Sequence, residues 1–226
     1  MKRRHFIGYL LLLILIPGVF LISFSLFGGR AYLFISLAVA LLSCVPFFLS
    51  FERKKANAPR MAILAVMVAL SVLGRFLFAA VPHFKPVAAI VVITGMYLGA
   101  EAGFLCGALS ALLSGFLFGQ GPWTPFQMVT WGVIGFLAAL LSAPLIRSRL
   151  LLGVYGVFAG FLFSAMMDVY TVLSIDGVFS FPRYFAAFLT ALPVTAVYCV
   201  SNVLFLLILA RPIGEKLMRI RKKYGV

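Results

Sequence analysis

The stretch PVAAIVVITGMYLGAEAGFLCGALSALLSGFLF, residues 86–118, decides the architecture of this chain. Its single charged residue is Glu101. As one helix it would be about 48 Å long, whereas a bilayer core is only about 30 Å thick. We therefore expect the chain to turn near Glu101 and to form two helices. Glycines recur every four residues through the turn: Gly95, Gly99, Gly103 and Gly107. This spacing predicts close packing of helix backbones in lipid.

The composition outside this stretch is equally apolar. Of the 226 residues, 64% are hydrophobic and 11% are charged, which is more apolar surface than a soluble domain of this length can bury. Because one span needs roughly 20 apolar residues, the hydrophobic pattern predicts eight spans. They lie near residues 5–27, 31–50, 61–81, 86–100, 102–118, 125–146, 151–173 and 184–210. The predicted fold class is an all-α, multi-pass protein of the cell membrane.

The charges predict the topology. The chain holds 19 Lys and Arg against 5 Asp and Glu, a net charge of +14. Most of these cations flank the spans, in the N-terminal KRRH, in the segment at 51–60, after the sixth span and in the C-terminal tail. Eight spans with both termini cytoplasmic place these clusters inside, as the positive-inside rule requires. We therefore exclude nucleic acid as a partner and expect the tail to lie against anionic headgroups of the bilayer.

The charged segment FERKKANAPR, residues 51–60, divides the chain once. Residues 1–57 are predicted to form an N-terminal transmembrane hairpin with a charged linker. Residues 58–226 are predicted to form a six-span, substrate-binding core with a basic cytoplasmic tail. The first span is too long to be a signal peptide and lacks a small-residue cleavage site.

The segment FGQGPWTPFQMVTWG, residues 118–132, is the strongest candidate for a binding loop. Glycine and proline on both sides of Trp123 break any helix there. The segment contains both tryptophans of the chain and two amide side chains: Gln120, Trp123, Gln127 and Trp131. Flat rings with amide donors suit the capture of a flat polar molecule. The alternative is an aromatic anchor at the membrane interface.

Two charged residues lie inside predicted core spans, at similar depth in the outer third of the bilayer: Arg75 and Asp168. A charge at a helix centre costs roughly 2.5–3.5 kcal/mol to insert, so each needs a partner, a water-filled cavity or a ligand. They either pair with each other or line an outward-open cavity. Asn202 lies deeper and is expected to bond neighbouring helices.

Three outer loops would frame such a cavity: residues 81–86, 118–123 and 174–183. The residues that we expect to contact substrate are Arg75, Phe84, Lys85, Gln120, Trp123, Gln127, Trp131, Asp168 and Arg183. His83 is suited to act as a general base or metal ligand, although a lone exposed histidine is more often neither. We predict no metal site.

Enzymatic activity has little support in the sequence. The chain has two histidines, no HExxH motif and no pair of carboxylates in one outer site apart from the distant Asp168 and Asp176. It also lacks GxxxxGK[ST] and so cannot hydrolyse ATP itself. We predict a non-catalytic binding subunit without cofactors that takes energy from partner proteins. A polytopic membrane enzyme or scaffold is the alternative.

Residues 58–210 resemble the substrate-binding S-component of energy-coupling factor (ECF) vitamin transporters. The resemblance rests on the six core spans and on four motifs: APRMAILAVMVALSVLGR, VPHFKP, FGQGPWTPFQM followed by WGVIG, and MMDVYTVLSIDG. It implies that the protein captures a vitamin outside the cell. It further implies docking on a transmembrane coupling subunit, with two separate ATPases that power uptake.

The resemblance also suggests residue roles and a substrate. Docking in this family uses small residues on the first core helix, and Ala65 and Ala69 match its AxxxA pattern, with Ala62 beside them. The form FGQGPWTPFQM is most similar to the branch assigned to cobalamin or related corrinoids, while riboflavin or another vitamin stays open. Residues 1–57 fall outside the resemblance, and their role is open.

Overall fold

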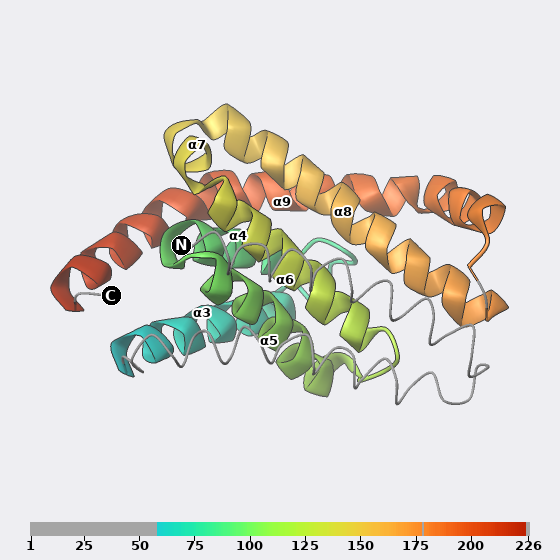
Figure 1. Cartoon of the computed structure of the whole chain (residues 1–226), viewed down its shortest axis with the longest axis horizontal. Helices are drawn as coiled ribbons and strands as arrows, with labels where there is room; N and C mark the ends of the chain where they lie inside the picture. Colours follow the sequence, from blue (N-terminus) through green and yellow to red (C-terminus); the bar gives the residue numbers. More distant parts are fainter. Residues whose placement is uncertain (1–57, 178, 225–226) are drawn as a thin grey trace, which may run out of the picture.

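The computed structural model describes residues 58–177 and 179–224, and this part of the chain is entirely helical. Its elements are α3 (Ala58–Leu77), α4 (Val87–Leu98), α5 (Ala100–Phe118), α6 (Thr124–Leu140), α7 (Ser142–Arg147), α8 (Arg149–Asp176) and α9 (Phe181–Tyr224). Figure 1 shows them as one bundle, with α3 on one side of α4 and with α7 and α8 on the other. The all-α prediction is confirmed for this part, whereas the two spans predicted before residue 51 lie outside the described residues.

The predicted turn within residues 86–118 is confirmed and lies at Gly99. Its φ of 97° lies in the left-handed region, which residues other than glycine rarely adopt. α4 therefore ends at Leu98, and α5 begins at Ala100 and runs back along it. The turn comes two residues before Glu101.

The helices run up and down, so that each end of the bundle gathers several helix ends. At one end, Arg60 at the start of α3 lies 3.7 Å from Glu101 at the start of α5. At the same end Arg221, near the end of α9, donates a 2.6 Å hydrogen bond to the carbonyl of Tyr97 in α4. We call this the basic end, because α9 ends here with Arg221, Lys222 and Lys223. The loop between α3 and α4 lies at the other end of α3, away from the basic end (Figure 1).

Glycines bring α4, α5 and α6 into backbone contact, as their spacing predicts. A Cβ atom built on Gly95 would overlap the carbonyl of Gly135 in α6, and one built on Gly103 would meet both that carbonyl and the Cα of Gly95. Gly107 lies directly against the backbone of Trp131. Backbones this close require that side chains be absent at the crossing points. The three helices therefore form one tightly joined unit.

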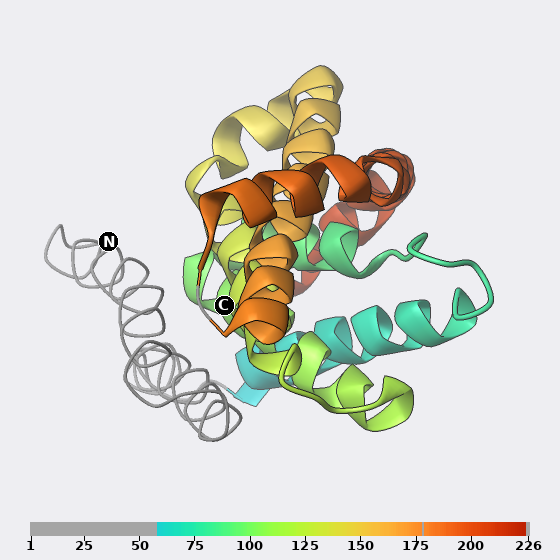
Figure 2. The same ribbon diagram turned by 90° about the vertical axis from the view of Figure 1, so that its right-hand side faces the viewer.

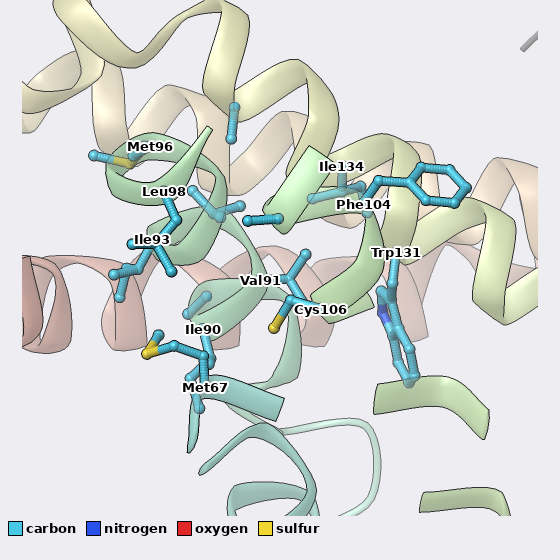
Figure 3. Packing of buried hydrophobic residues seen from close by; sticks show 14 of the residues in the cluster. Met67, Ile90, Val91, Ile93, Met96, Leu98, Phe104, Cys106, Trp131 and Ile134 are labelled. Atoms are coloured by element: carbon cyan, nitrogen blue, oxygen red, sulfur yellow. The ribbon is translucent and has the colours of Figure 1, made fainter. Parts of the chain in front are cut away.

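α4 occupies the centre of this unit. All 12 of its residues are buried, and their side chains pack with Met67 from α3, Phe104 from α5 and Ile134 from α6 (Figure 3). At 1.5 Å per residue α4 is about 18 Å long, too short to cross a bilayer by itself. Because protein covers it on every side, its length need not match the lipid.

Several span boundaries differ from the predicted ones. The span predicted at 125–146 is two helices, α6 and the six-residue α7, with the break at Leu141. The last span does not end near residue 210 but continues as α9 for 44 residues, with Pro193 and Pro212 inside it. Four helices, α3, α5, α8 and α9, are long and apolar enough to span a membrane, and α4 and α6 are shorter apolar helices.

Candidate functional site

A cavity of about 240 Å³ lies toward the end of the bundle opposite the basic end. We call it the upper cavity. The loop before α4 and five of the helices contribute to its lining. The lining residues are Arg75, His83, Lys85, Val87, Ala88, Gln127, Trp131, Phe163, Tyr198 and Asn202.

One side of the upper cavity is an aromatic wall. The rings of Trp131 and Phe163 stack with their centres 5.3 Å apart and their planes at 17°. The ring of Tyr198 meets that of Phe163 edge-on, with centres 5.0 Å apart. These ring contacts join residues from α6, α8 and α9 into one surface. The backbone of Trp131 is in turn packed against Gly107 of α5. Rings fixed in this way offer a large apolar face at low entropic cost.

Two cations adjoin the aromatic wall. Arg75 donates a 2.5 Å hydrogen bond to the hydroxyl of Ser114, and its guanidinium carbon lies 5.3 Å from the centre of the Trp131 ring and 4.9 Å from that of Phe118. The Lys85 ammonium lies 5.1 Å from the centre of the same Phe118 ring. Burial, together with the nearby charge of Arg75, lowers the pKa of Lys85. This part of the cavity therefore attracts electron-rich or anionic groups.

Amide side chains complete the polar lining. Asn202 donates a 3.3 Å hydrogen bond from Nδ2 to the carbonyl of Gly156, which confirms its expected role between helices. It also faces the upper cavity, as does Gln127 one helical turn before Trp131. Both amides carry donors and acceptors that suit a ligand with mixed polarity.

The segment between α3 and α4, residues 78–86, covers the cavity at one edge. His83 adopts a positive φ of 59°, and its Nδ1 lies 3.0 Å from the hydroxyl oxygen of Tyr198. The hydroxyl of Ser201 donates to the carbonyl of Lys85 at 3.1 Å. Apart from ring contacts of Phe78 and Phe84 with α9, these two bonds attach the segment to α9.

Comparison with known proteins gives one family. Residues 55–219 match the family model of the ECF-type riboflavin transporter, S component, which is well over half of the chain. The chain belongs to this family. No curated protein and no solved structure matches it.

Membership in this family supports several predictions and leaves the predicted substrate branch unconfirmed. The match supports the predicted role as the substrate-binding subunit of an ECF transporter, and the apolar helices agree with a membrane location. The cobalamin-type branch predicted from FGQGPWTPFQM is not confirmed, because the matching family is the riboflavin type.

Four of the nine predicted substrate residues of this S component line the upper cavity: Arg75, Lys85, Gln127 and Trp131. The structure does not place the other five there. The ring of Phe84 packs on Phe78 and Phe205.

The remaining predicted loop residues also have other contacts. Gln120 donates a 2.7 Å hydrogen bond to the carbonyl of Leu112, and Trp123 is 37% exposed, with its ring over Gly121. Arg183 forms a 2.9 Å salt bridge with Asp176 and does not line the cavity.

The structure does not contain the ion pair considered for Arg75 and Asp168. Arg75 is held instead by Ser114 and by two aromatic rings. Asp168 is buried in α8, and its Oδ2 atom has no hydrogen-bond partner among the described residues. Position along the helices placed both charges at similar depth, but depth does not decide which way a side chain points.

The alanines predicted for docking lie on the outer surface of α3. Ala62, Ala65 and Ala69 are exposed, whereas Met67 and Val68 of the same helix are buried. The exposed face is turned away from α4 and α5, the helices on which α3 packs.

Sequence reasoning selected Asp168 in α8 and Arg183 in α9 but missed Phe163 and Tyr198, which line the cavity from the same two helices. Phe163 and Tyr198 sit in long apolar helices of a chain with 24 Phe and 8 Tyr, so composition does not single them out. His83 was singled out only as a lone histidine, and its bond to Tyr198 joins residues 115 positions apart.

Proposed function

We propose that this S component captures riboflavin in the upper cavity and delivers it to an ECF transport complex. The observation that carries the proposal is the aromatic wall of Trp131, Phe163 and Tyr198 beside the Arg75 guanidinium, in a chain of the riboflavin transporter family. Riboflavin has a flat three-ring system with one apolar edge and one edge rich in carbonyl groups. The cavity offers a counterpart to each.

The chemistry assigns a role to each part of the lining. A flat ring system would lie along the aromatic wall, where offset ring contacts contribute about 0.5–1.5 kcal/mol beyond area burial. Arg75, Gln127 and Asn202 supply hydrogen-bond donors for ring carbonyls and nitrogens. Lys85 and His83, nearer the covering segment, are suited to the hydroxyl groups of the ribityl chain.

The cavity volume favours a moving cover. About 240 Å³ is less than the roughly 300–1,000 Å³ of ligand pockets in general. We infer that residues 78–86 shift outward as the ligand enters and close again over it, because this segment is the connection between α3 and α4 and belongs to neither helix. Breaking the contact between His83 and Tyr198 would release the segment at its centre.

The exposed alanines of α3 are the proposed docking face for the coupling subunit. Small side chains let a partner helix approach closely within lipid. The upper cavity then opens outside the cell if the positive-inside rule holds, since the basic end carries the tail cations. Riboflavin would enter from outside, and ATPases of the complex would power its release inside.

The test is the ligand content and binding of the purified full-length protein. We expect a protein purified from cells to carry a flavin, recognised by its absorbance bands and its mass. After the flavin is removed, titration with riboflavin should quench flavin fluorescence with a stoichiometry of one. Cobalamin in the same titration should neither bind nor compete. Binding of cobalamin but not riboflavin would overturn the substrate while leaving the transporter role intact.

A further inference from the structure

A second cavity, also of about 240 Å³, lies at the basic end, and we call it the lower cavity. It is lined by α4, α7, α8 and α9, through Met96, Tyr97, Leu145, Ile146, Arg149, Leu152, Leu207, Ala210, Arg211, Glu215 and Met218. It shares no residue with the upper cavity. The proposed vitamin site therefore does not account for it.

Two guanidinium groups from different helices face this cavity. Arg149 opens α8 and has no ion pair among the described residues. Arg211 donates from Nε to Glu215 at 3.1 Å, which leaves its two terminal nitrogens without another partner in the described part of the chain. With one carboxylate against two guanidinium groups, the lining carries a net positive charge. Its free donors favour an anion that has several oxygens.

Apart from Glu215 and Tyr97, the rest of the lining is apolar and meets the exposed apolar surface of α8 and α9. Leu152, Leu207 and Met218 line the cavity beside the arginines. Leu150 and Ile208, next to these residues in sequence, are 77% and 63% exposed on α8 and α9. A cationic pocket next to an exposed apolar surface suits a molecule with an anionic head and hydrocarbon chains.

The position of the lower cavity also favours lipid over a protein partner. It lies among α4, α7, α8 and α9, whereas the exposed alanines are on α3, which packs on the other side of α4 (Figures 1 and 2). A coupling subunit bound along α3 would leave the lower cavity in contact with the bilayer. The inner leaflet, to which the basic end is assigned by the positive-inside rule, is where anionic lipids meet basic protein segments.

We propose that the lower cavity binds the headgroup of an anionic phospholipid, with the phosphate between Arg149 and Arg211. Guanidinium groups bind phosphate oxygens in pairs, and they desolvate more readily than ammonium groups. The acyl chains follow Leu152 and Leu207 out onto the surfaces of α8 and α9. The bound lipid fixes the start of α8 against the second half of α9.

The experiment measures phospholipid retained by the purified full-length protein, by native mass spectrometry. The protein is equilibrated in detergent with equal amounts of phosphatidylglycerol and phosphatidylcholine. We expect preferential retention of one phosphatidylglycerol. Arg149→Gln and Arg211→Gln should each weaken it about fivefold, in line with the contribution of one basic residue near a lipid surface.

Two controls and one blocking variant separate this site from general attraction to charge. Arg147→Gln and Arg219→Gln remove exposed cations at the same end that do not line the cavity, so they should leave retention within about twofold. Leu207→Trp fills the apolar side of the cavity while keeping both arginines, and it should also reduce retention. Gel filtration and helical content establish that each variant is folded.

Three results would overturn the proposal. The first is equal loss of phosphatidylglycerol in the Arg147 and Arg149 variants, which would indicate a diffuse surface effect. The second is unchanged retention in Arg149→Gln, Arg211→Gln and Leu207→Trp. The third is displacement of the lipid by millimolar inorganic phosphate, which would show that the cavity selects a free anion and not a lipid.

Discussion

Trp131 of α6 and Phe163 of α8 stack with their ring centres 5.3 Å apart, and only 17° separates the ring planes. The pair joins α6 to α8, which are separated in the sequence by the short helix α7. Tyr198 of α9 packs edge-on against Phe163, and all three rings line the upper cavity. Because these side chains are already packed in place, a ligand ring that binds there does not have to fix their rotamers. Binding costs less entropy for this reason.

The first prediction concerns the two tryptophans. Trp131→Ala should weaken riboflavin binding by about 1–3 kcal/mol, roughly 5- to 150-fold, because it removes the stacking surface and the partner of Arg75. Trp123→Ala is the matched control, since Trp123 is exposed and does not line the cavity. Its affinity should stay within about twofold of wild type. Titration of flavin fluorescence gives both values, and the reverse ranking would place the ligand at the loop.

The second prediction concerns the covering segment. Tyr198→Phe keeps the ring contact with Phe163 but removes the hydroxyl that bonds His83. One hydrogen bond contributes about 0.5–1.5 kcal/mol net, so riboflavin should dissociate roughly 2- to 12-fold faster. Stopped-flow measurement of dissociation tests this. Thr190→Val, which removes an exposed hydroxyl elsewhere on α9, should leave the rate unchanged.

The third prediction is a pH dependence. Burial and Arg75 lower the pKa of Lys85, so its positive charge is lost at a lower pH than that of a free lysine. Riboflavin affinity should be constant while Lys85 is protonated and should fall as the pH rises through this lowered pKa. Lys85→Arg stays charged over the same range and should not show this fall. Any change in the protonation of riboflavin itself affects wild type and Lys85→Arg equally. Identical pH profiles of affinity for the two proteins would therefore exclude a role for the Lys85 charge.

The fourth prediction concerns docking through α3. Ala69→Trp should abolish or strongly reduce riboflavin uptake by cells, because the bulky ring prevents close approach of a partner helix. Riboflavin binding by the isolated S component should persist. Ala196→Trp places the same ring on an exposed position of α9 and should leave uptake intact. Normal uptake by the Ala69 variant would show that the coupling subunit docks on another surface.

The fifth prediction concerns the glycine contacts between helices. Gly135→Ala should destabilise the fold by about 1–3 kcal/mol, because its Cβ would overlap the carbonyl of Gly103. Gly153→Ala is the matched control in α8, where the nearest atom is 3.9 Å away. It should be neutral or stabilising by up to about 1 kcal/mol through helix propensity. Thermal unfolding in detergent compares them, and equal melting temperatures would show that the junction can relax.

The sequence predicted the helices well because apolar length and charge position are local properties. The turn near Glu101 followed from the mismatch between one 33-residue segment and the bilayer thickness, and the structure places it at Gly99. The end of the last helix was not predictable in this way. The apolar pattern marks only the part of a helix that lies in lipid. The backbone of α9 continues as helix beyond that part, to Tyr224.

The candidate site was predicted only in part. The direction of a side chain and its contacts with distant residues depend on the whole fold and cannot be inferred from the neighbouring sequence. Gln127 and Trp131 were identified from their loop motif and do line the upper cavity. Trp123, four residues before Gln127, turns its ring over Gly121 instead. Phe163 and Tyr198 carry no signal that separates them from the lipid-facing aromatics of the same helices.

The contact of Gly103 with Gly135 limits how this scaffold can change its substrate. With no side chain at the crossing, α5 and α6 cannot move closer, and a larger residue would force them apart at this point. A change of specificity in this chain therefore has to come from the lining side chains or from the segment at 78–86. Attempts to redirect the transporter to another vitamin should therefore mutate those positions and leave the helix frame untouched.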